Sequence, residues 1–194
     1  MTKTLNVTDR NSTQSTSRGN PRDHAIENQL DQRAFRDALG HYASGITIIA
    51  GHDGNEPLGF TCQSFFSVSV APPLISFSVK ADSSTFPRIR ETGKFSVNVL
   101  AQTQRALSDQ FARKGQDRWA GVTWKMTALR NPVIAGTLMW LDCKIFTEHQ
   151  VGDHSLVIGE VIEMSRNAWQ DGTPLLYFKG EYRRLHHDGG GSAA

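Results

Sequence analysis

The amino-acid sequence predicts a mainly β fold, an antiparallel barrel with short helices inserted between its strands. Most of its periodic segments have strand composition or alternate apolar and polar residues, and the helical patterns between them are short. The chain also lacks the motifs GxGxxG and GxxxxGK(S/T), which mark nucleotide-binding α/β domains. These observations argue against a Rossmann domain.

Length and composition indicate one folded core. The chain has 194 residues, of which 38% are hydrophobic, and its net charge of +2 does not indicate a nucleic-acid or membrane-surface partner. No apolar run approaches the ~18 residues of a membrane span. Cys62 and Cys143 lie in apolar contexts, so we expect buried free thiols rather than a disulfide, in a reducing, cytoplasmic setting.

The composition changes near both ends of the chain. Residues 1–29 are rich in Ser, Thr, Asn and charge, and too poor in large apolar residues to offset the entropy of ordering. We therefore expect a flexible polar tail there, and a second, Gly-rich tail at residues 186–194. A single domain is predicted over residues 30–185.

The first half of this domain begins with a short helix in residues 31–45. Asp31 is its candidate N-cap, and the apolar side chains recur at helical spacing. A strand over 45–52 and a turn containing Asp-Gly follow. Strands are predicted over 58–70 and 73–79, on either side of a double proline.

The second half alternates helices and strands before it ends in strands alone. A helix over 83–93 has Ser83 or Ser84 at its start, Pro87 in its first turn and Gly93 as its stop. The remaining predicted elements are a strand over 94–100, a helix over 101–115, and strands over 138–150, 153–164 and 174–185.

Hydroxyl side chains are unusually dense in the segment GFTCQSFFSVSVAPPLISFSV, residues 59–79. A buried hydroxyl without a partner costs about 1–3 kcal/mol, so core strands normally use Val and Ile at such density. These hydroxyls therefore need hydrogen-bond partners, which are either their neighbours in the sheet or a polar ligand. The residues concerned are Thr61, Ser64, Ser67, Ser69, Ser76 and Ser78.

Several segments, in this order along the chain, resemble the flavin reductase family, whose short NAD(P)H-dependent members feed reduced flavin to two-component monooxygenases. The matching stretches are GITII, GFTCQSFFSVSVAPPLISFSV, SSTFPRIRETGKFSVNVL, LSDQFA, VGDHSLVIGEV and PLLYFKGEYRRL, which span about residues 35–185. The resemblance implies a homodimeric split β-barrel of Greek-key topology, with flavin bound near the dimer interface.

The resemblance also implies which residues bind the flavin, FMN or FAD. Ser84 and Thr85 resemble the phosphate contacts, and Lys80 is the best candidate for an added cation, although it could equally be a solvated lysine. Ser67, Ser69 and Ser76 could instead face solvent or pair within the sheet. The full implied set is Pro57, Leu58, Gly59, Phe60, Thr61, Gln63, Ser64, Ser78, Val79, Lys80, Ser84, Thr85, Gln110, Phe111, His154, Tyr177, Phe178 and Gly180.

His154 matches the family's Gly-Asp-His histidine, which lies beside the nicotinamide of NADH or NADPH, so it is the one candidate catalytic residue; the alternative is a histidine that anchors a turn. One of Tyr177 and Phe178 is expected near a ring, and Gly180 is expected to allow close backbone approach. No histidine or cysteine spacing indicates a metal site.

The implied reaction is hydride transfer from nicotinamide to flavin, and the reduced flavin then diffuses to a separate monooxygenase. The alternatives are a tightly FMN-binding oxidase of the pyridoxamine-phosphate type and a non-catalytic flavin- or haem-binding module. The sequence leaves open the choice between FMN and FAD and between NADH and NADPH; Arg183 and Arg184 could meet a 2′-phosphate.

Overall fold

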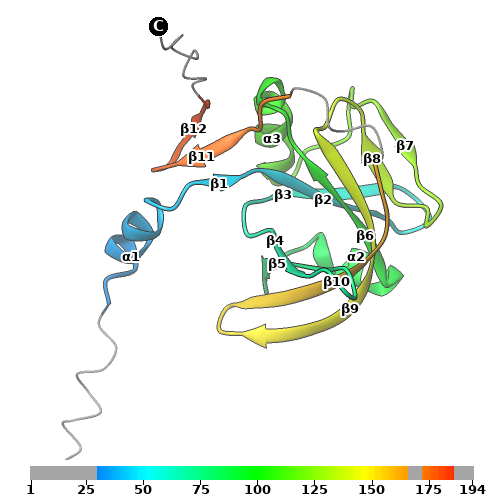
Figure 1. Cartoon of the computed structure of the whole chain (residues 1–194), viewed down its shortest axis with the longest axis horizontal. Coiled ribbons are helices and arrows are strands. Elements are labelled where there is room, and N and C mark those ends of the chain that lie inside the picture. The colour runs from blue at the N-terminus through cyan, green and yellow to red at the C-terminus, as the bar shows by residue number, and fades with distance from the viewer. Residues whose placement is uncertain (1–29, 166–171, 186–194) are drawn as a thin grey trace, which may run out of the picture. The chain divides into compact units, whose positions relative to one another are not determined.

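The computed structural model describes residues 30–165 and 172–185 (Figure 1). The tails predicted over residues 1–29 and 186–194 lie outside the described residues, so both stay predictions. The chain divides into two units, residues 1–38 and 39–194.

Helix α1 (Gln32–Leu39) belongs mostly to the first unit. The Oδ1 atom of Asp31 accepts a hydrogen bond of 2.9 Å from the backbone N–H of Arg33, which confirms the predicted N-cap. The helix buries none of its residues, and the side chain of Phe35 is 49% exposed.

The second unit is built on a seven-stranded antiparallel sheet with the strand order β3-β2-β6-β9-β10-β5-β4. The order departs from the sequence because β9 and β10, which form a long hairpin, insert between β6 and β5. Its strands are β2 (Thr47–His52), β3 (Pro57–Cys62), β4 (Phe66–Ser69), β5 (Leu74–Lys80), β6 (Lys94–Val99), β9 (Met139–Val151) and β10 (His154–Met164).

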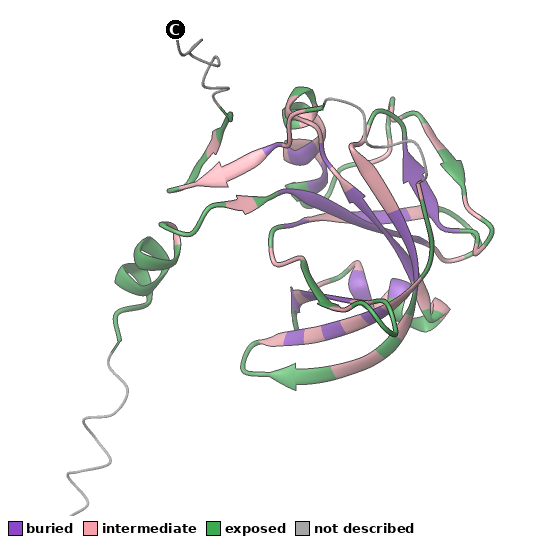
Figure 2. Ribbon diagram, in the orientation of Figure 1, coloured by how far each residue is buried: buried purple, intermediate pink, exposed green. Residues whose placement is uncertain are grey.

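The sheet curves until β3 comes into contact with β5, although no ladder joins these two strands in the described ranges. One hydrophobic cluster, which includes Phe77 and Phe95, fills the inside of the curve. A second cluster lies on the other face of β2, around Ile48 and Phe111. Strand β2 is therefore buried on both faces, as Figure 2 shows by the purple of its ribbon.

Helices α2 (Phe86–Thr92) and α3 (Arg105–Ala112) both contact β2 and β3, and each contributes to a different cluster. Figure 1 shows them on opposite sides of these strands. The predicted stop of α2 is confirmed, because Gly93 ends the helix at a φ of 69°. Its predicted start at Ser83 or Ser84 is wrong: Thr85 is the N-cap, although Ser83 Oγ does accept from the backbone N–H of Phe86. A short 3₁₀ turn, η1 (Gln102–Gln104), precedes α3.

The strand predicted over 58–70 is wrong in one respect, because it is broken between β3 and β4. Strand β3 pairs with β2 at one edge of the sheet, whereas β4 pairs with β5 at the other. The chain must leave the first ladder to join the second, and it does so over residues 63–65.

The strand predicted over 174–185 is also wrong, because the segment folds into a tight hairpin of β11 (Leu176–Phe178) and β12 (Glu181–Arg183). Lys179 and Gly180 have φ values of 51° and 79°, so they reverse the chain. This hairpin pairs with β1 (Ser44–Gly45). A second small sheet, β7 (Trp124–Met126) with β8 (Pro132–Ile134), was not predicted.

Candidate functional site

Two hydroxyls of the β3–β5 region, those of Thr61 and Ser64, have partners within the protein. Thr61 Oγ1 donates to the carbonyl of Ser108 on α3 at 2.7 Å. Ser64 Oγ donates to the carbonyl of Ser78 at 3.0 Å and accepts from the N–H of the same residue at 2.8 Å. Both hydroxyls therefore hold β3 and the following loop in place, in addition to any contact with a ligand.

A cavity of about 210 Å³ lies where the start of β3 meets the start of α2. Five of the residues implied for the flavin line it, and they come from two segments that are distant in sequence. The loop after α3 forms another part of its wall. The implied residues are Pro57, Leu58, Gly59, Ser84 and Thr85; the additional lining residues are Glu56, Arg88, Lys114, Gly115, Gln116, Asp117, Arg118 and Trp119.

Arg118 is the residue of this cavity that sequence reasoning missed. Its Nη1 atom donates to the carbonyl of Gly59 at 2.9 Å and to Thr85 Oγ1 at 2.8 Å, and its Nε donates to the carbonyl of Arg113 at 2.8 Å. The guanidinium thus joins β3, the residue before α2 and the end of α3. The sequence around position 118 is that of a polar loop, and nothing in it signals these distant acceptors.

The loop that carries Arg118 is fixed by Gln110. The side-chain amide of Gln110 donates to the carbonyls of Arg118 and Ala120 at 2.9 and 3.0 Å. The ring of Phe111 is completely buried and packs edge-on against Trp119. The expected flavin contact of Phe111 is therefore wrong for its side chain, because the core covers the whole ring.

The ends of β5 and β10 form a second polar group. His154 lies directly opposite Lys80 in the ladder, and its Nδ1 is 2.8 Å from Oδ1 of Asp153. This hydrogen bond lowers the pKa of Asp153, and the nearby positive charge of Lys80 adds to the effect. Lys80 does not line the cavity at the start of β3, so that cavity does not support Lys80 as a phosphate cation, and the role stays a prediction.

The remaining implied residues lie around these two groups. The side chains of Ser78 and Lys80, two residues apart on β5, point to the same face of the sheet, whereas Ser64 bonds the backbone of Ser78. Val79 belongs to the hydrophobic cluster that contains Phe77 and Phe95, and the partly buried Phe60 packs against that cluster. The side chain of Gln63 is exposed.

Comparison with known protein families shows to which family the chain belongs. The family model described as "Flavin reductase like domain" matches residues 39–186, which covers most of the chain. The chain belongs to the flavin reductase-like family.

Relatives within this family span most of the chain. The reductase subunit HsaB of a flavin-dependent monooxygenase from Mycobacterium tuberculosis is 38% identical over 154 residues, which are 79% of this chain and 82% of HsaB. The FMN reductase (NADH) SmoA of Agrobacterium fabrum is 35% identical over 85% of this chain and 93% of its own. The NADH:FAD oxidoreductase SgcE6 of Streptomyces globisporus, solved with NAD and FAD fragments, superposes with a TM-score of 0.77 at 32% identity, over 82% of this chain and 95% of SgcE6.

In this flavin reductase-like chain the C-terminal hairpin braces α3. The hydroxyl of Tyr182 is 2.9 Å from Ser108 Oγ and 2.7 Å from Asp109 Oδ1, and burial raises the pKa of Tyr182. Tyr177 packs on the ring of Tyr182, whereas Phe178 meets His41 edge-on. Gly180 has a positive φ, which favours glycine, and no protein atom lies within 4 Å of where its Cβ would be; the close approach to a ligand expected there stays a prediction.

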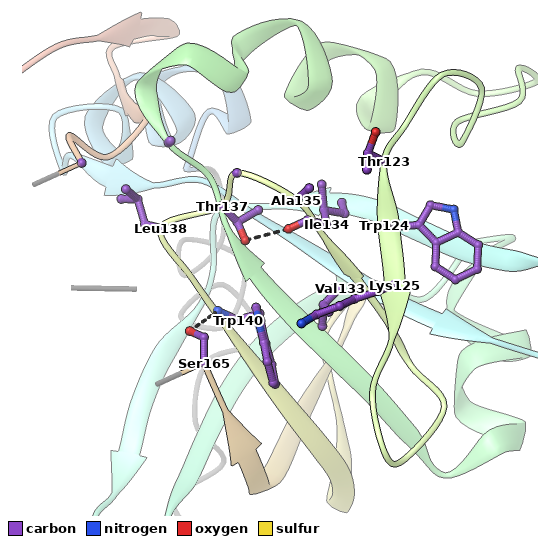
Figure 3. A pocket seen from close by; sticks show the side chains of 13 residues that line it. Thr123, Trp124, Lys125, Val133, Ile134, Ala135, Thr137, Leu138, Trp140 and Ser165 are labelled. Carbon is purple, nitrogen blue, oxygen red and sulfur yellow. Dashed lines mark hydrogen bonds between the residues drawn. The ribbon is translucent and has the colours of Figure 1, made fainter. Parts of the chain in front are cut away.

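A larger cavity, about 660 Å³ in volume, lies beside the β7–β8 hairpin, and Figure 3 shows its walls. None of the implied flavin residues lines it. Two of its hydroxyls are engaged within the domain: Thr137 donates to the carbonyl of Ile134, and Ser165 accepts from the N–H of Trp140. The implied flavin residues therefore point to the smaller cavity at β3 and not to the larger one.

Two absences hold for the described residues of this domain. No helix in residues 30–165 and 172–185 is long and apolar enough to cross a membrane. In the same ranges, no three His, Cys, Asp or Glu side chains gather as metal ligands would. Cys62 and Cys143 are buried free thiols, as predicted.

Proposed function

We propose that this chain is an NAD(P)H-dependent flavin reductase, which reduces FMN or FAD and releases reduced flavin to a separate monooxygenase. The observation that carries the proposal is the cavity at the start of β3. It gathers Pro57, Leu58 and Gly59 with Ser84 and Thr85, although some 25 residues separate the two segments. A flavin tail carries hydroxyls and a phosphate, and a cavity of hydroxyls, backbone groups and a guanidinium fits such a ligand.

The named relatives favour the reductase over both alternatives. HsaB is named as the reductase subunit of a monooxygenase, and SmoA as an NADH-dependent FMN reductase. Neither name indicates a pyridoxamine-phosphate oxidase or a non-catalytic binding module. NADH is accordingly the donor to test first, with FMN and FAD as acceptors.

The reaction needs alignment more than it needs reactive side chains. Bound flavin and nicotinamide supply the hydride chemistry, so the protein has to hold the two rings in contact and exclude water. Ser64, fixed on Ser78 by two hydrogen bonds, holds the loop after β3 against β5 between the cavity and His154. The protein thus positions a flavin tail at one end and a nicotinamide at the other.

His154 is proposed to hold the nicotinamide. Its Nδ1 bonds Asp153, which leaves Nε2 available for the carboxamide or a ribose hydroxyl. The imidazole side chain is 39% exposed and lies at a strand end, so a ligand can reach it. Its role is to orient the ring, and it transfers no proton in this proposal.

The finer architecture is part of the proposal too. We infer a split β-barrel that forms a homodimer, with flavin near the dimer interface. Exposed apolar side chains on β4, β9 and β10 support a covered surface on these strands, among them Phe66, Val68, Phe146 and Ile162. Sedimentation velocity tests this inference: a dimer is expected, and a monomer at micromolar concentration would contradict it.

A steady-state assay tests the activity. The purified protein is mixed with NADH and free FMN, FAD or riboflavin, and the loss of nicotinamide absorbance is followed. Rapid turnover that increases with free flavin is expected. A protein that keeps its flavin bound, ignores NADH and consumes oxygen with pyridoxamine phosphate would favour the oxidase alternative.

A further inference from the structure

Arg118 is a partly buried cation whose hydrogen bonds all go to neutral acceptors. These acceptors are the carbonyls of Gly59 and Arg113 and the hydroxyl of Thr85. No carboxylate pairs with it within the described ranges. Its charge is therefore held in the cavity wall without being neutralised.

Of the other charged groups of the wall, Lys114 is an exposed ammonium, and the rest already have partners. Arg88 bonds Asp53 and Glu56. The backbone N–H groups of Glu56 and Asn55, and then the Arg88 guanidinium, lower the pKa of Asp53. Asp117 accepts from the backbone N–H of Trp119 at 2.9 Å. Arg118 is thus the guanidinium in this wall that has capacity for an added anion.

The geometry of the guanidinium leaves one edge free. An arginine has five N–H donors in a planar fork, and the bonds above use those of Nε and Nη1. The two N–H groups of Nη2 bond nothing in the part of the chain that the structure describes. Burial lowers the pKa of Arg118, but an arginine remains charged in proteins, and its hydrogen bonds to neutral oxygens leave that charge without an opposite charge beside it.

We propose that Arg118 is the phosphate anchor of the flavin site and binds a phosphate oxygen through Nη2. This inference rests on the proposed function, and it adds a binding residue that the sequence did not indicate. The existing bonds hold the guanidinium plane in place before the ligand arrives, so little side-chain entropy is lost when phosphate binds.

Arg118 also orients a second hydrogen-bond donor to the phosphate, the hydroxyl of Thr85. Because Thr85 Oγ1 accepts the N–H of Nη1, its own proton is directed away from Arg118. The Thr85 hydroxyl can then donate to the same phosphate that Nη2 binds. Riboflavin has no phosphate, so neither Arg118 Nη2 nor the Thr85 hydroxyl should add to its binding affinity.

The test compares FMN with riboflavin in Arg118→Gln and Arg118→Lys. Loss of hydrogen bonds to a charged group should raise the Kd for FMN roughly 10- to 100-fold in Arg118→Gln, and less in Arg118→Lys, which keeps the charge. The Kd for riboflavin should change less than about threefold, since its contacts remain. Flavin fluorescence gives both constants, and the melting temperature checks the fold of each variant.

Lys144→Gln is the matched control, because it removes an exposed cation from β9, away from the cavity wall. Equal weakening of FMN and riboflavin in the Arg118 variants would show that Arg118 only braces Gly59 and Thr85, and an unchanged FMN Kd would also overturn the proposal. If Arg118→Gln fails to fold, the FMN-specific loss must still be seen in Arg118→Lys.

Wild-type turnover separates this inference from the function on which it rests. If the wild-type protein oxidises NADH with free flavin but Arg118→Gln and Arg118→Lys bind FMN normally, only the Arg118 assignment fails. If the wild-type protein oxidises no NADH while FMN binding depends on Arg118, the phosphate anchor stands and the reductase function fails.

Discussion

Replacing Gly59 by alanine tests how β3, α3 and the cavity depend on one another. A Cβ at this position would lie 2.7 Å from Cε1 of Phe111, which is 0.7 Å short of the 3.4 Å at which ordinary contact begins. The Phe111 ring is completely buried, so it cannot turn toward solvent to relieve the clash. The carbonyl of Ile49 at 3.3 Å prevents the strand from moving back freely.

Overpacking of this kind costs about 1–3 kcal/mol of unfolding free energy. At about 2–4 °C per kcal/mol for a domain of this size, the melting temperature should fall by roughly 2–12 °C. FMN binding should weaken as well, because the Gly59 carbonyl is an acceptor for Arg118. Thermal unfolding by circular dichroism and FMN titration give the two values.

Gly45→Ala is the matched control, because no atom lies within 4 Å of its Cβ position. It should stay within about 0.5 kcal/mol of wild type. Adding Phe111→Leu to Gly59→Ala should recover stability beyond the sum of the single changes, since the smaller side chain makes room. A Gly59→Ala protein with the same melting temperature as the wild type would refute the packing argument.

Three further predictions concern the same region. His154→Ala should lower kcat/KM for NADH about tenfold, the cost of one hydrogen bond and lost positioning, while FMN affinity and melting temperature stay near wild type; His149→Ala is the control, and a destabilised protein with normal NADH kinetics would leave His154 a turn anchor. Ser84→Ala with Thr85→Ala should weaken FMN by ~1–3 kcal/mol more than riboflavin, and equal weakening would mean that the phosphate lies elsewhere. Asp53→Asn should lower the melting temperature at neutral pH, because the backbone N–H groups of Glu56 and Asn55 and the Arg88 guanidinium hold the pKa of Asp53 below its usual 3.8. This contribution is fully present above pH 3.8 and is lost as pH falls through the lowered pKa, so the two melting curves should converge in acid; a constant difference would contradict the assignment.

Local sequence patterns were sufficient to predict most elements of the fold. The hydrophobic run of β2, the glycine that ends α2 and the Asp-Gly turn before β3 all depend on neighbouring residues, so the sequence displays them directly. The break between β3 and β4 was not visible, because it results from pairing with strands at opposite edges of the sheet. Strands β7 and β8 have three residues each, which is too short for alternation to show.

The site residues that are contiguous in sequence could be predicted, whereas those that long-range contacts bring into the site could not. The hydroxyls of residues 59–79 stood out by composition, but their partners, such as Ser108 for Thr61, lie far along the chain. Arg118 belongs to the cavity only because it reaches Gly59 and Thr85, which are 59 and 33 residues away in sequence. Such long-range contacts follow from the fold and leave no local pattern.

The central claim is that this chain reduces free flavin with a nicotinamide and then lets the flavin go. The most direct measurement mixes NADH and excess FMN with a trace of the protein in the absence of oxygen and follows the absorbance of both. Many molecules of FMN should be reduced per protein, one for each NADH consumed, and the reduced flavin should pass through a membrane that retains the protein. Reduction that stops at one flavin per protein, or no loss of NADH at all, would contradict the account.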